Sequence, residues 1–305
     1  MRVSAEAPIL LTGATGYIGR ALLERLLAKG RRVRCVVRDA TKLTVDEAAV
    51  EVVEADLADK GALARSFEPG CVAYFLVHAL GAGSSLGREE RALAENFAAA
   101  ARDAGAARIV YLGGLVDADE PDLSDHMSSR VLVGRLLAES GVPTIELRAS
   151  IVIGSGSLSF ELIRKVVDWV PVIALPGWAD NLAQPIAVDD VVSYLVAAAT
   201  ADLEAGVYEI GGADQISYRD LIEEYARQVG AQRLTVSLPI PQAAVEAATA
   251  ISQPALELLP AEAQEALKLL ESMRHSTVVR NPPPSDVFEV QPMSVSDAIG
   301  RAVGS

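Results

Sequence analysis

The stretch "PILLTGATGYIGRALLERLLAKG", Pro8 to Gly30, decides the fold. It begins with a short apolar run, passes through three glycines and continues as an amphipathic run that ends at Gly30. A short apolar run bounded by glycine is typical of a buried strand, and leucines spaced by three and four are typical of a helix. The stretch therefore predicts a strand, a tight turn and a helix in direct succession.

Gly13, Gly16 and Gly19 stand in a GxxGxxG spacing at the turn between this strand and this helix. In that context the spacing indicates a dinucleotide-binding loop. Gly13 permits the tight turn, Gly16 lets the backbone approach a pyrophosphate, and Gly19 allows the helix to pack closely on the strand. The free N–H groups and the positive dipole end of the helix would face the phosphates. The alternative is a glycine-rich turn that binds nothing.

Strand-like and helix-like segments alternate through the first half of the chain. The strand-like segments are almost continuously apolar, which is typical of strands buried on both faces. They are "PILLT", "RRVRCVV", "VEVVEADL", "CVAYFLVH", "RIVYLGG" and "TIELRASIVIG", with helix candidates such as "REERALAENFAAAARDAG" and "SSRVLVGRLLAESG" between them. The pattern predicts an α/β fold with a doubly wound parallel Rossmann sheet and helices on both faces.

The rhythm changes in the second half, where helices and prolines dominate and only "GVYEIGG" has the character of a strand. We therefore expect a Rossmann domain over residues 1–155, to which residues 184–212 return as a last helix and strand. The rest of residues 156–305 would form a smaller, mostly helical C-terminal cap. Two amphipathic helices are expected there, at residues 241–251 and 261–273.

The composition of the chain limits which partners and which cell compartment are expected. The chain has 305 residues, 50% of them hydrophobic, and a formal charge of −14, which disfavours nucleic acid as a partner. No charge-free apolar stretch reaches the roughly 18 residues of a membrane span, and no basic leader precedes an apolar segment. We therefore expect a cytoplasmic protein without a membrane partner. Cys35 and Cys71 lie in strand-like runs without metal-site spacing, which predicts buried, reduced thiols and no metal.

The end of the second strand indicates which nucleotide binds. A carboxylate there would bind the ribose 2′-OH of NAD(H). The strand "VRCVV" instead ends in Arg38, with Asp39 one residue later. A guanidinium suits a 2′-phosphate, because it donates two parallel hydrogen bonds and stacks on adenine. NADP(H) is therefore preferred. NAD(H) stays open if the strand ends one residue later, and an exposed arginine at a strand end is the plain alternative.

The predicted cofactor contacts extend along the carboxyl edge of the sheet. Asp56, after the third strand, is placed to contact the adenine edge or else to cap the next helix. His78 closes the fourth strand, beside the switch point of the sheet where the nicotinamide half would lie. In full, the predicted cofactor-binding residues are Gly13, Thr15, Gly16, Tyr17, Ile18, Gly19, Arg38, Asp56, Leu57, Val77, His78 and Arg130.

Several segments together resemble one protein family. "TGATGYIG", "VVRDATKL", "EADLAD", "LRASIVIGSGS" and "QPIAVDDVVSYL" resemble the atypical, extended-type short-chain dehydrogenase/reductases. Within that superfamily "AYFLVHAL", "RIVYLGGL" and "LSDHMSSR" look like the NmrA-like, NAD(P)H-binding subgroup. The resemblance covers about residues 8–212. It implies a Rossmann domain that binds NAD(P)(H), with substrate held between the carboxyl edge of the sheet and a small cap.

The same resemblance implies a catalytic Ser, Tyr and Lys, with Tyr and Lys in a YxxxK spacing, and this chain departs from all three. Gly114 or its neighbour stands where the serine would end the fifth strand. In place of YxxxK the chain has HxxxR, His126 to Arg130, at the predicted start of the next helix. Tyr111 lies in the middle of the fifth strand, so we expect it in the core and not as a displaced catalytic tyrosine.

His126 and Arg130 form a chemically feasible but poorly tuned catalytic pair. Arginine grips ribose hydroxyls and supplies a positive field, but it cannot relay a proton. A histidine with a pKa of about 6.5 can donate one, although a cation four residues away depresses that pKa. Alternatively Ser124 or Asp125 caps the helix, His126 faces solvent in its first turn and Arg130 alone contacts the cofactor. His78 is a second candidate acid, unless its side chain is merely packed.

These observations predict an NADP(H)-dependent oxidoreductase that transfers hydride to a carbonyl, quinone or activated alkene of an apolar small molecule. Phe160, Trp169 and Trp178 either line its apolar pocket or belong to the core. The missing Ser, Tyr and Lys favour the alternative, a non-catalytic NADP(H)-binding redox sensor or an assembly or scaffold protein. They also disfavour a nucleotide-sugar epimerase or dehydratase, which needs YxxxK. The sequence leaves a homo-oligomer open.

Overall fold

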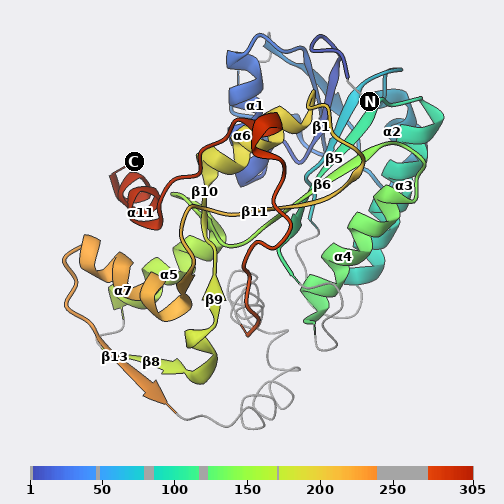
Figure 1. Cartoon of the computed structure of the whole chain (residues 1–305). Helices are drawn as coiled ribbons and strands as arrows, with labels where there is room; N and C mark the ends of the chain where they lie inside the picture. The colour runs from blue at the N-terminus through green and yellow to red at the C-terminus, as the bar shows by residue number, and fades with distance from the viewer. Residues whose placement is uncertain are drawn as a thin grey trace.

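The centre of the protein is a seven-stranded parallel sheet with the strand order β11-β6-β5-β4-β1-β2-β3 (Figure 1). Its strands are β1 (Ile9–Thr12), β2 (Val33–Val37), β3 (Glu51–Glu54), β4 (Val72–Phe75), β5 (Arg108–Gly114), β6 (Thr144–Ala149) and β11 (Gly206–Ile210). The structure is a computed structural model, and it describes residues 3–45, 49–78, 86–116, 123–169, 172–238 and 274–304. The predicted Rossmann fold is confirmed.

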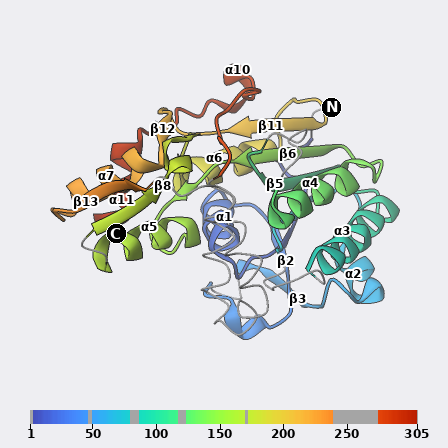
Figure 2. The ribbon, with the colours of Figure 1, turned by 90° about the horizontal axis from the view of Figure 1, so that it is seen from below.

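Helices cover both faces of the sheet, as Figure 2 shows. One face carries α1 (Tyr17–Ala28) and α6 (Val188–Ala198), and the other carries α2 (Lys60–Ser66), α3 (Leu86–Asp103) and α4 (Asp125–Ala138). Successive strand residues alternate between the two layers: Leu11 and Tyr74 pack with α1 and α6, whereas Leu10 and Phe75 pack with α2 and α3. Both faces of each central strand are therefore buried, which explains the nearly continuous apolar runs in the sequence.

The direction of strand succession reverses at β1, which pairs with β2 on one side and with β4 on the other. The register sets Thr12, the last residue of β1, opposite Phe75, the last residue of β4. The hydroxyl of Thr12 also donates to the carbonyl of Tyr74 at 2.8 Å. Ligands of open parallel sheets bind in the crevice outside the carboxyl ends of the strands at such a switch point. The glycine loop follows β1, and His78 follows β4, so both lie at this switch point.

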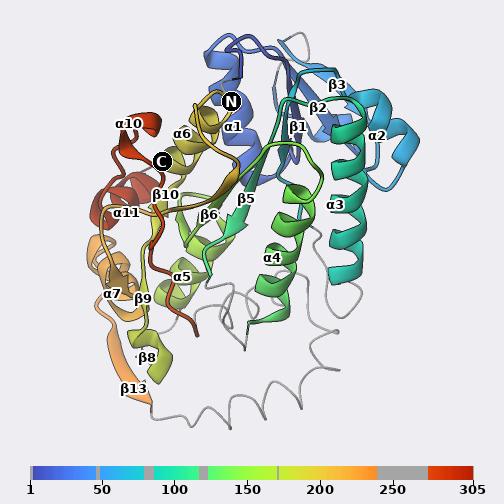
Figure 3. The same cartoon turned by 45° about the vertical axis from the view of Figure 1, so that its right-hand side comes forward.

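The described part of the C-terminal region gathers beside the sheet (Figure 3). Its longer elements are α5 (Leu158–Trp169), β8 (Val172–Pro176), α7 (Tyr218–Gln228), β13 (Leu234–Leu238) and α11 (Val295–Gly304). Its shorter elements are β7 (Val152–Ile153), η3 (Gly177–Asp180), β9 (Leu182–Ala183), β10 (Ile186–Ala187), β12 (Ile216–Ser217) and α10 (Ser285–Phe288). A separate apolar core joins these helices, with Phe160 fully buried and packed edge-on against Tyr225.

The expectation that only one strand follows residue 155 is wrong. β8 pairs in parallel with β13, and β9 pairs antiparallel with β12. Each is short, and a short apolar run cannot be assigned to strand or helix by its periodicity alone. Pro176 at the end of β8 further weakens the strand signal, because proline removes a ladder hydrogen bond. The two helices expected at residues 241–251 and 261–273 lie outside the described residues.

Candidate functional site

The glycine loop runs from the end of β1 to the start of α1. Gly13 has a φ of +78°, and a Cβ there would stand 2.7 Å from the backbone carbonyl carbon of Leu76. A Cβ on Gly19 would stand 2.7 Å from the carbonyl carbon of Gly13. Any larger residue would therefore separate the loop from β4 in the first case and α1 from the loop in the second. These contacts match the roles assigned to Gly13 and Gly19 from their spacing.

Gly16 is the N-cap of α1, and its position is open. Its backbone is extended, with a φ of −79° and a ψ of 169°, and no side chain caps the helix at this end. The first turn of α1 carries no acidic residue. The N–H groups at the start of a helix need acceptors, and an anion supplies them. The next residue, Tyr17, packs its ring against Gly156. Burial raises the pKa of Tyr17 to about 12, and the negative charges of Asp189 and Glu161 contribute less.

The end of β2 carries an exposed cation, Arg38, and a hydrogen-bonded carboxylate, Asp39. Arg38 is exposed directly after the strand. Asp39 accepts hydrogen bonds from the backbone N–H of Thr41 at 3.1 Å and from its hydroxyl at 2.5 Å, and so caps the 3-10 turn η1 (Ala40–Lys42). These bonds, with smaller help from Lys42, lower the pKa of Asp39. The carboxylate of Asp39 is thus held by its own turn.

The remaining predicted contacts lie after β3 and β4. Asp56 is exposed and accepts a hydrogen bond from the N–H of Ala58 at 2.8 Å, whereas Asp59 caps α2. The alternative that Asp56 caps this helix is therefore wrong. Leu57 is buried, and Val77 packs against the same core, so neither presents its full side chain to a ligand. A cofactor would meet these two residues mainly through their backbone.

Arg130 joins two histidines at the carboxyl edge of the sheet. Ser124 caps α4, with its hydroxyl oxygen accepting from the N–H of Met127 at 3.3 Å, so the helix begins where the sequence predicted. The Nε of Arg130 donates to Nε2 of His126 at 3.1 Å, and Nη1 of Arg130 lies 3.2 Å from Nε2 of His78. We call these three residues the His–Arg–His cluster. His126 is half-buried and hydrogen-bonded, so it does not simply face solvent.

The cluster has unusual electrostatics. Burial lowers the pKa of His78 well below its usual 6.5, and the positive charge of Arg130 acts in the same direction. His78 is therefore neutral at physiological pH. Within the described ranges, Arg130 has no carboxylate within 4.0 Å, although it is half-buried. The cluster thus combines the positive charge of Arg130 with the neutral ring of His78.

A side chain at the position of the expected serine would displace neighbouring side chains of α4. A Cβ on Gly114, the last residue of β5, would stand 2.8 Å from the Cε of Met127 and 3.2 Å from the Cδ of Arg130. The hydroxyl of Tyr111, on the same strand, donates to the backbone carbonyl of Arg130 at 3.2 Å. Tyr111 is fully buried, as predicted, and burial raises its pKa above the usual range. Both residues set the position of α4 relative to β5.

Buried charges behind α4 were missed by the sequence reasoning. Glu146 and Arg148 on β6 form an ion pair of 2.7 Å, and burial raises the pKa of Glu146 while Arg148 lowers it. A Cβ on Gly134 would stand 2.6 Å from the carboxyl carbon of Glu146, so the helix lies close to this pair. Ser129 donates to the buried carboxylate of Glu90 on α3. A signal existed, because Glu146 and Arg148 are two residues apart in an apolar strand and so share a face.

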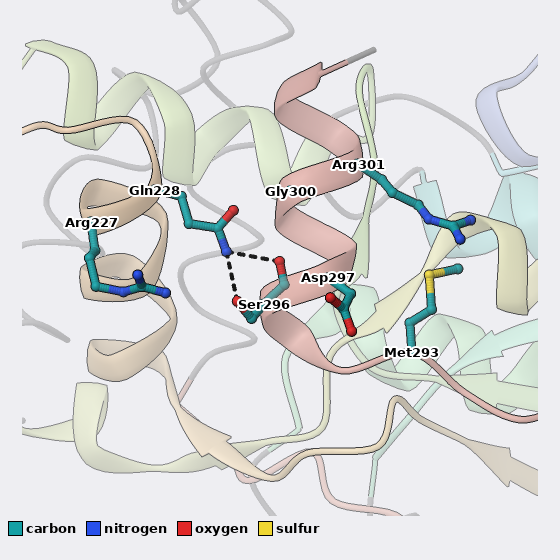
Figure 4. A pocket seen from close by; sticks show the side chains of 7 residues that line it. All are labelled: Arg227, Gln228, Met293, Ser296, Asp297, Gly300 and Arg301. Atoms are coloured by element: carbon teal, nitrogen blue, oxygen red, sulfur yellow. Dashed lines mark hydrogen bonds between the residues drawn. The ribbon is translucent and has the colours of Figure 1, made fainter.

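One hollow in the described part of the chain lies away from this cluster. Figure 4 shows it between α7 and α11, with a volume of about 530 Å³. Gln228 reaches across it and donates to the carbonyl and the hydroxyl of Ser296 at 2.8 and 3.1 Å. None of the predicted site residues lines it. Of the aromatic residues proposed for a pocket, Phe160 belongs to the core, Trp178 is half-buried against it, and the side chain of Trp169 lies outside the described part.

The described ranges contain neither a metal-site cluster nor a helix that could cross a membrane. No group of three or more His, Cys, Asp or Glu side chains in them could hold a metal ion. None of the helices that the structure describes combines the length and the apolar character needed to cross a bilayer.

Comparisons with known proteins show the family to which this chain belongs. Residues 13–149 match a family model described as NAD(P)H-binding. The (4-alkanoyl-5-oxo-2,5-dihydrofuran-3-yl)methyl phosphate reductase of Streptomyces griseus subsp. griseus is 31% identical over 229 residues, which are 73% of this chain and 74% of that protein. The chain belongs to the NAD(P)H-binding family of atypical short-chain dehydrogenase/reductases. The resemblance seen in the sequence motifs is thereby confirmed.

A second reductase and a solved structure are also similar to this chain. The ceramide reductase of Caulobacter vibrioides is 28% identical over 247 residues, covering 79% of this chain and 76% of that protein. The UDP-glucose 4-epimerase of Thermotoga maritima superposes with a TM-score of 0.73 over 97% of both chains, at 14% identity. At that identity the epimerase shows the fold alone. The chain is thus a member of an NAD(P)H-binding oxidoreductase family whose similar relatives include reductases.

Proposed function

We propose that the protein is an NADPH-dependent reductase that transfers hydride to a carbonyl, quinone or activated alkene of an apolar small molecule. The observation that carries this proposal is the His–Arg–His cluster beside the glycine loop. Cation and imidazole groups converge there at the carboxyl ends of β4 and β5, where a Rossmann sheet holds the reactive half of a dinucleotide. A purely structural nucleotide site would not require that convergence.

The residues of the loop fit a dinucleotide. The uncapped start of α1 and the open face at Gly16 would receive the pyrophosphate, with Tyr17, Ile18 and Gly19 offering N–H groups. A bound nicotinamide cofactor would supply the hydride. This chain's own residues would bind and orient it: the backbone near Val77 and His78 toward the ribose of the nicotinamide, and one N–H of Arg130 to a hydroxyl of that ribose.

The end of β2 supports NADP(H) over NAD(H). The ribose 2′-OH of NAD(H) would need a carboxylate, and that of Asp39 is already held by Thr41. Arg38 is exposed beside it and matches a 2′-phosphate in charge and geometry. Asp56 would lie near the adenine edge.

The substrate would lie between the carboxyl edge of the sheet and the cap. We assign residues 1–155 with 184–212 to cofactor binding and the rest of residues 156–305 to the cap, because α5, α7 and α11 share a core of their own. By their names, two similar reductases act on an alkanoyl-oxo-dihydrofuranyl methyl phosphate and on a ceramide. An apolar substrate with a carbonyl group fits both the family and the cluster.

The test measures binding and turnover separately. NADPH and NADH are titrated by fluorescence, and oxidation of NADPH is followed with menadione, benzylideneacetone and benzylacetone as acceptors. We expect NADPH to bind at least tenfold more tightly than NADH, and Arg130→Met to abolish most turnover. Arg135→Met is the matched control, since Arg135 is exposed on the same helix. Tight NADPH binding without oxidation by any acceptor would favour the non-catalytic sensor or scaffold.

A further inference from the structure

The two contacts of Arg130 determine where the histidines carry their protons. A guanidinium has five N–H donors and no acceptor. The Nε of Arg130 donates to Nε2 of His126, and its Nη1 stands 3.2 Å from Nε2 of His78. Each Nε2 must therefore present a lone pair. A ring with a lone pair at Nε2 keeps its single proton at Nδ1, so both histidines are neutral Nδ1–H tautomers in this arrangement.

Neutral imidazoles are poor acids. A general acid works best when its pKa lies near the operating pH, and for histidine that acid is the imidazolium. Protonation of either Nε2 would point an N–H at an N–H of Arg130 and break the contact. Burial and the charge of Arg130 also keep the pKa of His78 far below neutrality. The histidines in this geometry orient the guanidinium and do not deliver a proton.

The charge of Arg130 is available to a ligand. Arg34 and Arg148, which are also buried or half-buried, are paired with Glu51 and Glu146, respectively, at 2.7 Å. Arg130 has no such carboxylate among the described residues. Two of its five N–H donors meet histidines, and within the described part of the chain the other three have no hydrogen-bond partner. One of these suffices for a ribose hydroxyl, so two remain for an oxygen that gains negative charge.

We propose that Arg130, held between two neutral histidines, binds the oxygen that becomes negative during reduction, and that the substrate is an alkene conjugated to a carbonyl group. The inference rests on the proposed function and names its substrate class. The β-carbon of the alkene receives the hydride and its electron pair. The alkene pair shifts to join the α-carbon to the carbonyl carbon, and the carbonyl pair moves to oxygen, where Arg130 holds it. The oxygen pair then re-forms the carbonyl group, the carbon–carbon pair takes a proton from water at the α-carbon, and the water leaves as hydroxide; NADP⁺ is the oxidised product.

An isolated ketone fits the cluster less well. Hydride addition to a ketone leaves an alkoxide, which is strongly basic and needs a proton from an adjacent acid as it forms. An enolate spreads its charge over oxygen and carbon, so a fixed cation can hold it until solvent protonates the carbon. Preorganised donors aimed at developing charge lower barriers without transferring a proton. The cluster offers that arrangement and lacks a matched acid.

The protonation state is tested without cofactor. Nitrogen-15 spectra of the histidine rings of the whole chain report the tautomer of each ring, and the chain has only 3 histidines. His78→Gln and His126→Gln assign the signals by removing one each. We expect both rings to be neutral at pH 7, with the proton on Nδ1. An imidazolium, or a proton on Nε2 of either ring, would overturn the inference.

Variants separate orientation from acid catalysis. Glutamine can accept from Arg130 through its side-chain oxygen but cannot act as an acid. We therefore expect His126→Gln to lower kcat for benzylideneacetone about threefold to fivefold, and His126→Leu, which removes the acceptor, about tenfold further. Arg130→Met should lower kcat by about 100-fold to 1000-fold, as loss of an oxyanion donor does. It should raise the Kd of NADPH by no more than about tenfold. Equal changes in kcat and Kd would mean that Arg130 only clamps the cofactor.

Product analysis separates this inference from the proposed function. We expect benzylideneacetone to give benzylacetone, with deuterium from labelled NADPH at the β-carbon and a solvent proton at the α-carbon. Benzylacetone, which keeps the ketone but lacks the alkene, should not be reduced. Formation of the allylic alcohol would overturn the inference and leave the reductase standing. Absence of NADPH oxidation with these probes and with menadione would overturn the proposed function itself.

Discussion

Substitutions at Gly16 and Gly19 separate cofactor binding from folding, although the two positions are three residues apart. In Gly19→Ala the new Cβ would stand 2.7 Å from the carbonyl carbon of Gly13 and 3.1 Å from the Cα of Ala14, where ordinary contact begins at 3.4 Å. Both neighbours are backbone and cannot rotate away, so α1 must move off the loop. Overpacking of this kind costs about 1–3 kcal/mol, and we expect the upper end.

Gly16→Ala meets almost no protein. Its Cβ would have one close neighbour, the carbonyl oxygen of Gly13 at 3.3 Å, and its backbone conformation suits alanine. Since alanine is a weaker N-cap than glycine, the free energy of unfolding should fall by about 1 kcal/mol or less. The methyl group instead occupies the space proposed for the pyrophosphate. We expect the Kd of NADPH to rise at least about tenfold, which corresponds to about 1.4 kcal/mol.

The assays are urea unfolding of the free protein and fluorescence titration with NADPH. For Gly19→Ala a loss of about 3 kcal/mol corresponds to a Tm lower by roughly 5 °C in a chain of this size, since the unfolding entropy is about 2.1 cal/mol/K per residue. Gly61→Ala is the matched control, because Gly61 lies in α2 and its Cβ would meet only side-chain atoms at 3.4 Å. Wild-type affinity in Gly16→Ala would refute the placement of the pyrophosphate. Wild-type stability in Gly19→Ala would refute the packing argument.

Three further predictions concern the site. Arg38→Leu should raise the Kd of NADPH by about tenfold or more, since charged hydrogen bonds contribute about 1.5–3 kcal/mol, and should leave the Kd of NADH within about twofold; equal losses would contradict the assignment. The folded-state pKa of His78 is depressed below 6.5, so its contribution to stability is complete above that pH and is lost as the pH falls below it. Urea unfolding should show a loss of at most about 1.4 kcal/mol per pH unit, and His78→Gln should remove that slope. Tyr111→Phe deletes the bond to the carbonyl of Arg130 and should lower the free energy of unfolding by about 1 kcal/mol, whereas Tyr208→Phe, whose hydroxyl bonds to an exposed carbonyl, should change it little.

The sheet and the glycine loop were predictable because their determinants are local. The three glycines lie within seven residues, and Gly13 and Gly19 are each required by a backbone contact with the neighbouring strand or within the loop. The strands of the sheet are nearly continuous in apolar residues because helices cover both faces, so their burial can be predicted from the sequence. The start of α4 was predictable for the same reason, since Ser124 caps it through a bond three residues along the chain.

The cap was less predictable because its short strands depend on distant partners. β8 pairs with β13, which follows it by about sixty residues, and nothing local distinguishes β8 from a buried helical turn. Similarly, the carboxylate of Asp39 looked available in the sequence. In the structure this carboxylate instead accepts hydrogen bonds from Thr41 in the turn that follows β2. Asp39 is the N-cap of that turn.

One of the two contacts in the His–Arg–His cluster could be predicted from the sequence. A spacing of four residues on a helix brings His126 to Arg130. The contact of His78 with Arg130 joins residues 52 apart and depends on how far β4 and β5 extend before the chain turns. The topological switch point indicated that His78 would lie at the crevice, but the identity of its partner required the structure. The protonation of both rings follows only once the two distances are known.

The exchange of YxxxK for HxxxR links these observations physically. The permanent charge of Arg130 disfavours a proton on either ring that touches it, and the resulting lone pairs hold the guanidinium where it is. Each part of the cluster therefore stabilises the state of the others. A site of this kind can hold negative charge but cannot release a proton near neutral pH. We infer that the missing tyrosine is not replaced in function by His126; instead, the chemistry shifts to acceptors whose reduction makes a stabilised anion.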